Sequence, residues 1–421
     1  MRFQQYLPQV SKMKNRKNLV TLVLIWLGWF SIVYGFQALV TARLDLVRPD
    51  TSVFWSASET MPDSNEGKIY LLEPFLNRQV AWDSEYYVGI AVGGYDDPAA
   101  GTVINPANGA MLIKNYSFFP LYPYIMHAVM LPLVIFGLNA IATASLAGVI
   151  VSLLGTLAGM IALWELTHDY LDEDSAFRAI LYLLIFPTGF FLAQVYTEGL
   201  FIGLSFWCLL LLKRQNLFWA SVLAVFAAWA RAHGVLLAIP IGIAWLSQFD
   251  WNKNVIKQFN WEKALNPGCV FLPLAAYLAW RYTAMGEGWA MLQTALFGRG
   301  LLLLDVSVAD WIRAFQYAIE HPQGLVYFGI EVFTILVSII AVFWFLSREP
   351  QIALYSLAII IFSVFSGSAL SMARYMLVAP ANYIFLAHLG RHRAFDRVWV
   401  IASILIMGMS ATLFSFDMWA G

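Results

Sequence analysis

Long apolar stretches separated by short polar segments recur along the whole chain. A helix crosses a bilayer when it holds about 20 mostly apolar residues, because its backbone groups are then satisfied within the segment. The pattern therefore predicts an all-α polytopic membrane protein. The candidate spans are 19–40, 118–138, 139–163, 177–193, 195–212, 217–231, 233–248, 265–284, 323–346, 352–372, 375–390 and 397–415.

Two longer polar regions, 42–115 and 286–321, interrupt this pattern. Because loops rich in lysine and arginine stay in the cytoplasm, the basic N-terminus places 42–115 outside. Counting back from the basic residues near the C-terminus places 286–321 on the same outer face. The basic residues expected inside are Lys12, Lys14, Arg16, Lys17, Lys213, Arg214, Lys253, Lys257, Arg348, Arg391, Arg393 and Arg397.

The crossings before Lys213 raise a parity problem. Four apolar runs lie between the first outer loop and Lys213, although an odd number of crossings is needed. Either one of these runs does not cross, or 217–248 is a single long span and Lys213 lies outside. The first alternative is favoured, because Arg231 and Pro240 suit a hairpin turn better than a straight helix. The prediction is a bundle of about eleven transmembrane helices, with interfacial helices in the first outer loop.

These boundaries predict one transmembrane catalytic domain over 1–421. The composition and charge of the chain then exclude some classes of function. The net charge of -1 provides no basic groove for nucleic acid. Cys208 and Cys269 fall in apolar runs, which is typical of core residues rather than of a disulfide or a metal site. The apolar run that starts at Leu19 is too long for a cleavable signal. The parts of the domain are the first span 19–40, the first extracytoplasmic loop 42–115, the central spans 116–285, the second extracytoplasmic loop 286–321 and the C-terminal spans 322–421.

The segment AWDSEYYVGIAVGGY, residues 81–95, lies in the first outer loop. On a helix, Trp82 and Tyr86 share one face, Asp83 begins the neighbouring row, and a Gly-Gly pair ends the helix. A helix lying flat on the membrane would hold Asp83 at the level of lipid phosphates. The alternative is an interfacial anchor whose acidic residues, including Glu85, are merely solvated.

Four further segments combine aromatic and ionisable residues, and each also has an ordinary structural explanation. NYSFFPLYP (115–123) is either a rigid wall for an apolar tail or a sugar, or a helix start in an aromatic belt. FPTGFFLAQVYTEGLF (186–201) contains Glu198. Either this acid faces a cavity or a charged partner, or it stabilises the N-terminus of a helix. WARAHGVLL (229–237) contains Arg231, and SMARYMLVAP (371–380) contains Arg374. Either these arginines bind a phosphate, or their side chains extend (snorkel) to the membrane interface.

The predicted topology can place the ionisable residues of these segments on one side of the membrane. Arginines at lipid-phosphate depth beside an outer-loop acid indicate chemistry on a lipid-linked phosphate. The four residues concerned are Asp83, Glu198, Arg231 and Arg374.

The ordered set WDSEYY…GGY, FFPLYP, YTEGLF, ARAHG and ARYMLVAP resembles the PIG-V-type mannosyltransferases, relatives of GPI mannosyltransferase II. The resemblance runs from about Trp82 to about Leu386. These enzymes are GT-C glycosyltransferases, so the resemblance implies a GT-C-like bundle whose donor is a polyprenyl-phosphate sugar. Glu198 matches the family's Tyr-Ser-Glu segment, with Thr197 in place of Ser. Arg231 matches the family's Thr-Arg-x-x-Gly turn, which here lacks the Thr and has His233 before the Gly.

The resemblance implies that Asp83 is the catalytic acid/base residue of an inverting transfer, with mannose the expected sugar. Lipid phosphate is a good leaving group that needs positive charge, for which Arg231 is the first candidate and Arg374 the second. Expected supporting residues are Trp82, Glu85, Tyr86, Phe119, Pro120, Tyr122, Pro123, Tyr196, Glu198, His233 and Tyr375.

No cofactor is expected beyond the donor, and a divalent-metal requirement stays open because no metal-binding cluster is evident. The expected partners are membrane lipid, the polyprenyl-phosphate-linked sugar and an acceptor glycolipid or glycan. A bacterial plasma membrane and an endoplasmic reticulum membrane both fit, with the site on the non-cytosolic side. A secondary transporter is the main alternative, although transporters typically carry paired broken helices and midplane charges. A non-catalytic membrane scaffold is the third.

Overall fold

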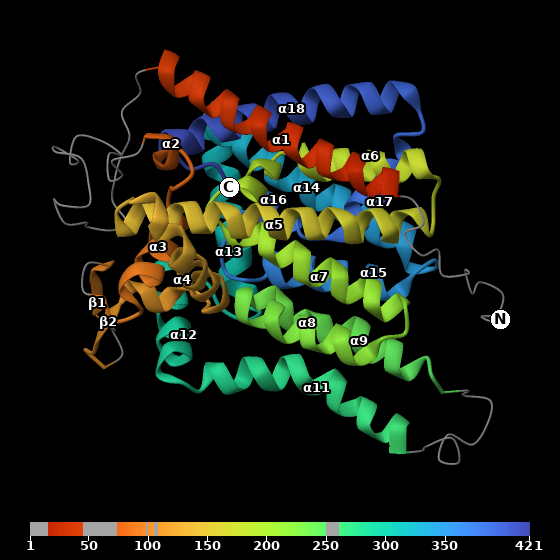
Figure 1. Cartoon of the computed structure of the whole chain (residues 1–421). Coiled ribbons are helices and arrows are strands. Elements are labelled where there is room, and N and C mark those ends of the chain that lie inside the picture. Colours follow the sequence, from red (N-terminus) through yellow and green to blue (C-terminus); the bar gives the residue numbers. More distant parts are fainter. Residues whose placement is uncertain (1–15, 45–73, 98–99, 105–107, 250–260) are drawn as a thin grey trace.

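The computed structural model describes residues 16–44, 74–97, 100–104, 108–249 and 261–421. In these ranges the chain is mostly helical, and its long helices lie side by side in an elongated bundle (Figure 1). Part of the first outer loop and four of the basic residues expected inside, Lys12, Lys14, Lys253 and Lys257, lie outside the described residues.

Four of the described helices are long and apolar enough to cross a membrane, namely α1 (Arg16–Arg43), α5 (Ala140–His168), α14 (Pro322–Leu346) and α18 (Arg393–Ser415). This finding supports an integral membrane protein. The remaining long elements are α6 (Glu173–Leu184), α7 (Thr197–Lys213), α8 (Leu217–Ala230), α9 (Ala238–Leu246), α11 (Trp261–Arg281), α15 (Pro350–Val364) and α17 (Pro380–Leu389).

Several predicted spans were wrong as single helices. The span 177–193 divides into α6 and the 3-10 turn η5 (Gly189–Ala193), because Pro187 and the tightly packed Gly189 end the regular helix. The span 233–248 divides into η6 (Ala232–Leu237) and α9, and 352–372 ends early as α15. The span 375–390 begins within the short helix α16 (Met372–Met376), and its longer helix, α17, begins only at Pro380. Two of these breaks carry Arg231, His233, Arg374 and Tyr375 of the candidate site.

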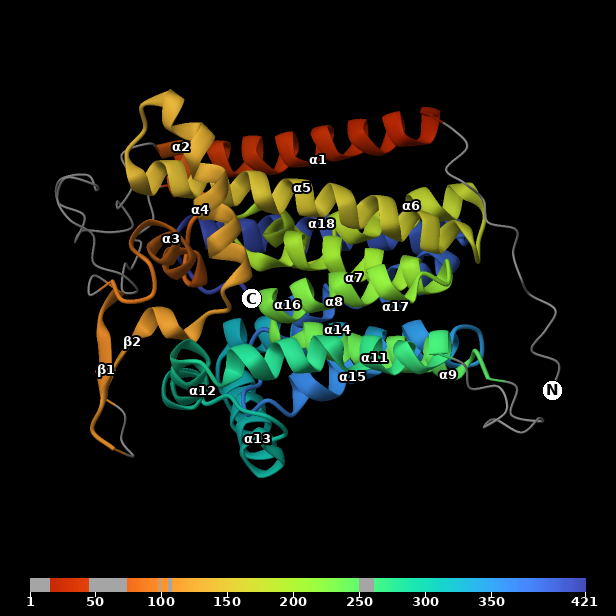
Figure 2. The same ribbon diagram turned by 60° about the horizontal axis from the view of Figure 1, so that its bottom comes forward.

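One end of the bundle gathers the elements that do not follow its long axis (Figures 1 and 2). They include α4 (Leu121–Leu133), which lies across this end and therefore identifies 118–138 as the run that does not follow the bundle. The short antiparallel pair β1 (Thr102–Ile104) and β2 (Met111–Ile113) lies here too, with Val103 opposite Leu112. The other elements at or near this end are α2 (Pro74–Asn77), α3 (Asp83–Gly93), η3 (Lys114–Ser117), η4 (Val134–Phe136), α12 (Ala284–Phe297) and α13 (Leu304–Glu320).

Glycines set the distance between α5 and α7 at the centre of the bundle. A Cβ atom built on Gly155 would lie 2.6 Å from the Gly199 carbonyl oxygen, and one on Gly203 would lie 2.7 Å from the Gly155 carbonyl oxygen. Small residues spaced four apart let two membrane helices approach closely. The close contact fixes the first turn of α7, which carries Glu198.

Candidate active site

Four charged side chains from distant parts of the chain meet at the end of the bundle that holds α3. The Arg374 guanidinium donates from NH1 to Asp83 Oδ2 at 2.9 Å, and its Nε lies 3.7 Å from Glu198 Oε1. Arg231 donates to the same Glu198 oxygen and, at 3.0 Å, to Thr197 Oγ1. The result is one continuous series of acid, arginine, acid and arginine, which we call the charged cluster.

The members of the charged cluster differ in their access to solvent. The Asp83 side chain is 21% exposed, whereas those of Arg374 and Glu198 are 8% and 0% exposed. Arg231 is nearly as buried, at 10%. The snorkelling alternative for both arginines is therefore wrong, as is a merely solvated Asp83. A buried carboxylate needs cationic partners, so Glu198 holds the arginines in place, while Asp83 is the most exposed of the four side chains.

Two non-glycine residues with positive φ angles lie beside this cluster. Trp82, at φ 56°, directly precedes Asp83, and Ser371, at φ 67°, starts the turn that carries Arg374. Non-glycine residues adopt such angles only where surrounding contacts impose them, and they gather at functional sites. The Trp82 ring meets Trp419 edge-on at 5.1 Å, and the Ser371 N–H donates to Tyr327 Oη at 3.1 Å.

Glu331 of α14 supports the same turn and was missed by sequence reasoning. Its side chain is buried, and its carboxylate accepts the backbone N–H of Ala373, at the start of α16. This contact anchors the short helix that carries Arg374. A single acid inside the apolar run 323–346 was the available signal, because an ionisable group at membrane depth is costly unless it has a partner.

The Tyr375 ring lies among three guanidinium groups. The Cζ atoms of Arg231 and Arg374 are each 5.7 Å from the ring centroid, and that of Arg299 is 5.1 Å away. These separations are typical of cation–π contacts. Arg299 follows α12 and donates to Ser366 Oγ at 3.1 Å and to the Leu370 carbonyl at 2.9 Å. Sequence reasoning missed Arg299, for which the only signal was one cation in the apolar part of the second outer loop.

The ARAHG turn folds back tightly on α8. A Cβ atom on Gly234 would lie 2.1 Å from the Ala227 carbonyl carbon, so only glycine fits this position. His233 is buried, with Nε2 3.0 Å from Ser363 Oγ and its ring 5.2 Å from that of Tyr375. His233 thus packs behind the arginines and ties the turn to α15.

Residues of α3 and of the segments packed against it make aromatic contacts near the charged cluster. Tyr86 stacks on Phe118 with ring centroids 4.9 Å apart, and α3 ends at Gly93 as the sequence predicts. Tyr196 lies beneath Arg374, 5.3 Å from ring centroid to Cζ, and its hydroxyl donates to the Ala81 carbonyl. Glu85, in the first turn of α3, is fully buried rather than solvated.

The FFPLYP residues do not join the charged cluster. Phe119 stacks on Trp280 of α11, with ring centroids 4.6 Å apart. Tyr122 is fully buried and donates to the Gly148 carbonyl of α5. Pro120 precedes α4 and Pro123 lies in its first turn, where proline is favoured. These residues hold α4 against α5 and α11, which is a packing role.

Comparison with known proteins gives one family match. A family model described as Mannosyltransferase (PIG-V) matches residues 21–293. A search of curated proteins found no match.

Among solved structures, the chain is similar to ArnT from Cupriavidus metallidurans bound to undecaprenyl phosphate. The identity is 11%, the TM-score is 0.46, and the match covers 95% of this chain and 76% of that one. It is also similar to the Archaeoglobus fulgidus oligosaccharyltransferase in complex with Zn and sulfate, at 16% identity and a TM-score of 0.42. That match covers 92% of this chain but only 53% of the oligosaccharyltransferase, so this chain spans about half of its length.

Proposed function

Because the chain belongs to the PIG-V mannosyltransferase family, we propose that it transfers mannose from a polyprenyl-phosphate donor to an acceptor glycolipid or glycan. The observation that carries the proposal is the charged cluster, in which a reachable carboxylate is held by an otherwise buried set of ion pairs. Such an arrangement fits a group that must accept a proton from an acceptor hydroxyl without moving.

We propose that the end of the bundle that holds α3 faces the non-cytosolic side. If α4 lies along the membrane surface and the other apolar runs cross the membrane, the chain has about eleven transmembrane segments. Arg214 and Arg348 then fall at the opposite, cytoplasmic end, in agreement with the positive-inside rule. In this proposal the described part of the 42–115 loop and the 286–321 segment share the outer face with the charged cluster.

In the proposed reaction, the acceptor oxygen attacks the anomeric carbon of the donor sugar. Asp83 takes the proton of the acceptor hydroxyl, a new glycosidic bond forms, and the bond from the anomeric carbon to the phosphate oxygen breaks. The lipid phosphate leaves with the bonding electrons. Direct displacement inverts the anomeric centre, so a β-linked donor gives an α-linked product.

The arginines would stabilise the charge that develops on the leaving phosphate, since fixed cations in a water-poor site act strongly on such charge. Arg374 also orients Asp83 through their hydrogen bond. Glu198 keeps both arginines at fixed positions, so the site needs little rearrangement when charge moves.

The test measures sugar transfer from radiolabelled polyprenyl-phosphate mannose in membranes from cells that lack other such transferases. We expect the wild-type chain to form a mannosylated product and Asp83→Asn to lower turnover by roughly 10²–10⁴, the usual contribution of a general base. The control is Asp174→Asn, an exposed acid in the first turn of α6, which should keep full activity.

Three outcomes would each contradict a part of the proposal. Unchanged turnover in Asp83→Asn would remove the assignment of the base. Absence of product from the wild-type chain with every acceptor fraction of the membrane would remove mannosyl transfer itself. A product with retained configuration at the anomeric carbon would exclude the direct displacement.

A further inference from the structure

Arg299 differs from the other two arginines around Tyr375. Arg231 and Arg374 are neutralised by Glu198 and Asp83, but within the described ranges no carboxylate lies at ion-pair distance from Arg299. Its guanidinium donates hydrogen bonds to two neutral oxygens, Ser366 Oγ and the Leu370 carbonyl. A guanidinium has five N–H donors, so it can hold these two acceptors and still bind an anion.

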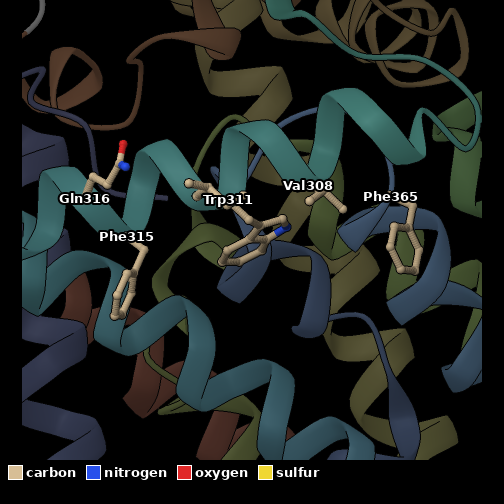
Figure 3. A pocket seen from close by; sticks show the side chains of 6 residues that line it. Val308, Trp311, Phe315, Gln316 and Phe365 are labelled. Atoms are coloured by element: carbon tan, nitrogen blue, oxygen red, sulfur yellow. The ribbon is translucent and has the colours of Figure 1, made fainter.

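An apolar groove of about 510 Å³ follows α13 (Figure 3). Figure 3 shows Val308, Trp311 and Phe315 projecting from one side of α13, with Phe365 at the end of α15 beside them. Ile312 and Phe315 are 54% and 68% exposed. The groove is lined by Val308, Trp311, Ile312, Phe315, Gln316 and Phe365.

The groove and Arg299 both contact the same short segment of backbone, residues 365–366. Phe365, which lines the groove, directly precedes Ser366, which accepts from Arg299. The connection between α12 and α13 runs alongside this stretch, because Leu303 N donates to the Phe365 carbonyl at 2.9 Å and Gly300 N to the Ser366 carbonyl at 2.8 Å. A single positive charge therefore lies beside an elongated apolar surface, which is complementary to a lipid with one anionic head and one long chain.

We propose that Arg299 and the α13 groove bind the lipid half of the donor, with Arg299 on the phosphate and the groove on the first isoprenoid units. This inference rests on the proposed function and assigns its donor subsite. Arg299 and Arg374 contact the same Tyr375 ring, so a phosphate held by Arg299 lies beside the arginine that orients Asp83. The second outer loop thus supplies the lipid-binding part of the site.

The first test measures binding of undecaprenyl phosphate to the purified full chain in detergent, which requires no turnover. We expect Arg299→Gln to weaken binding roughly ten- to a hundredfold, as for loss of a hydrogen bond to a charged group. Arg299→Lys should retain part of the affinity, because it keeps the charge. The control is Arg313→Gln, an exposed cation on α13 that pairs with Asp310.

The groove is tested with Ile312→Ser, which we expect to weaken binding of undecaprenyl phosphate by roughly three- to tenfold. Ile319→Ser, a similarly exposed isoleucine of α13 that does not line the groove, is the matched control and should bind normally. Ile312→Ser should leave the affinity for inorganic phosphate nearly unchanged, because the lost contact is with the isoprenoid chain and not with the phosphate.

Three results would overturn the inference. Equal affinity of the wild type and Arg299→Gln would show that Arg299 only ties two loops together. Equal effects of Ile312→Ser and Ile319→Ser would show a general lipid-facing surface. Displacement of undecaprenyl phosphate by equimolar phosphatidylglycerol would assign the groove to bulk phospholipid.

Kinetics separate this inference from the proposed function. If the wild-type chain transfers mannose, Arg299→Gln should raise the donor KM more than it lowers kcat. If it transfers no mannose but the binding differences hold, the proposed function fails and the lipid-phosphate site stands. If transfer is normal and no variant changes donor KM or binding, only the inference fails.

Discussion

Asp83 and Arg374 are 291 positions apart in the sequence, and their Oδ2 and NH1 atoms lie 2.9 Å apart. The contact joins the first outer loop to a break between two C-terminal helices. A non-glycine residue with a positive φ angle lies one residue before Asp83 and another lies three residues before Arg374, and both are supported by separate tertiary contacts. The geometry of the site therefore depends on the whole bundle rather than on either loop alone.

Arg231 and Glu198 should show strong energetic coupling. Removing one partner of a buried ion pair leaves an uncompensated charge, which costs about 3–5 kcal/mol of stability. We expect Glu198→Gln and Arg231→Gln each to lower the thermal unfolding temperature, and the double variant to be less destabilised than the sum of the two. Thermal unfolding of the four proteins in detergent measures the coupling, and additive effects would contradict it.

The sequence located the charged cluster because its chemistry is visible in short segments. Glu198 and Arg231 are ionisable residues within apolar runs, and Asp83 stands beside Trp82 in an aromatic segment of the first outer loop. The end of α3 was also predictable, since glycine is favoured at the position that follows the last turn of a helix. The roles assigned to these residues stay predictions.

The residues that sequence reasoning missed act through tertiary contacts. Glu331 has its role only because the start of α16 packs against α14, and Arg299 only because the second outer loop lies beside residues 366–370. No local pattern reports such partners. The breaks after Leu184 and Val364 were missed for a related reason, because hydropathy continues through them while the backbone leaves the helix.

Gly199 and Gly28 should respond in opposite ways to the same substitution. A Cβ atom on Gly199 would lie 2.3 Å from the Ser152 carbonyl oxygen, whereas one on Gly28 of α1 meets nothing within 4 Å. We expect Gly199→Ala to destabilise the chain by about 1–3 kcal/mol through overpacking, and Gly28→Ala to be neutral or slightly stabilising. Thermal unfolding of both variants checks this, and equal effects would contradict the close contact of α5 and α7.

Asp172 should stabilise the start of α6 in a pH-dependent manner. Its side chain accepts the Ser175 backbone N–H at 2.8 Å and pairs with Arg391, and these contacts lower the pKa of the Asp172 carboxyl well below its usual value. A lowered pKa in the folded state adds stability that is present above the unfolded pKa, about 3.9, and is lost as the pH falls through the folded value.

Asp172→Ala should therefore reduce stability at neutral pH by about 0.5–2 kcal/mol, as for loss of a helix cap. The difference from wild type should shrink as the pH falls below about 4. Chemical unfolding at several pH values measures both, with Asp174→Asn as the control acid of the same turn. A difference that does not change with pH would show that the Asp172 charge has no part in it.

Glu331 should act on turnover through α16. Gln keeps an oxygen that can accept the Ala373 N–H, whereas Ala removes the acceptor and leaves that buried group unpaired. We expect Glu331→Ala to lower kcat by roughly tenfold or more with little change in donor KM, because misplacing Arg374 misdirects Asp83 rather than the lipid site. Glu331→Gln should recover most of the activity.

The matched control is Glu320→Ala, which removes an exposed acid at the end of α13 and should behave as wild type. If Glu331→Ala and Glu331→Gln lose activity equally, the charge of Glu331 matters in its own right, and its role is not the support of α16.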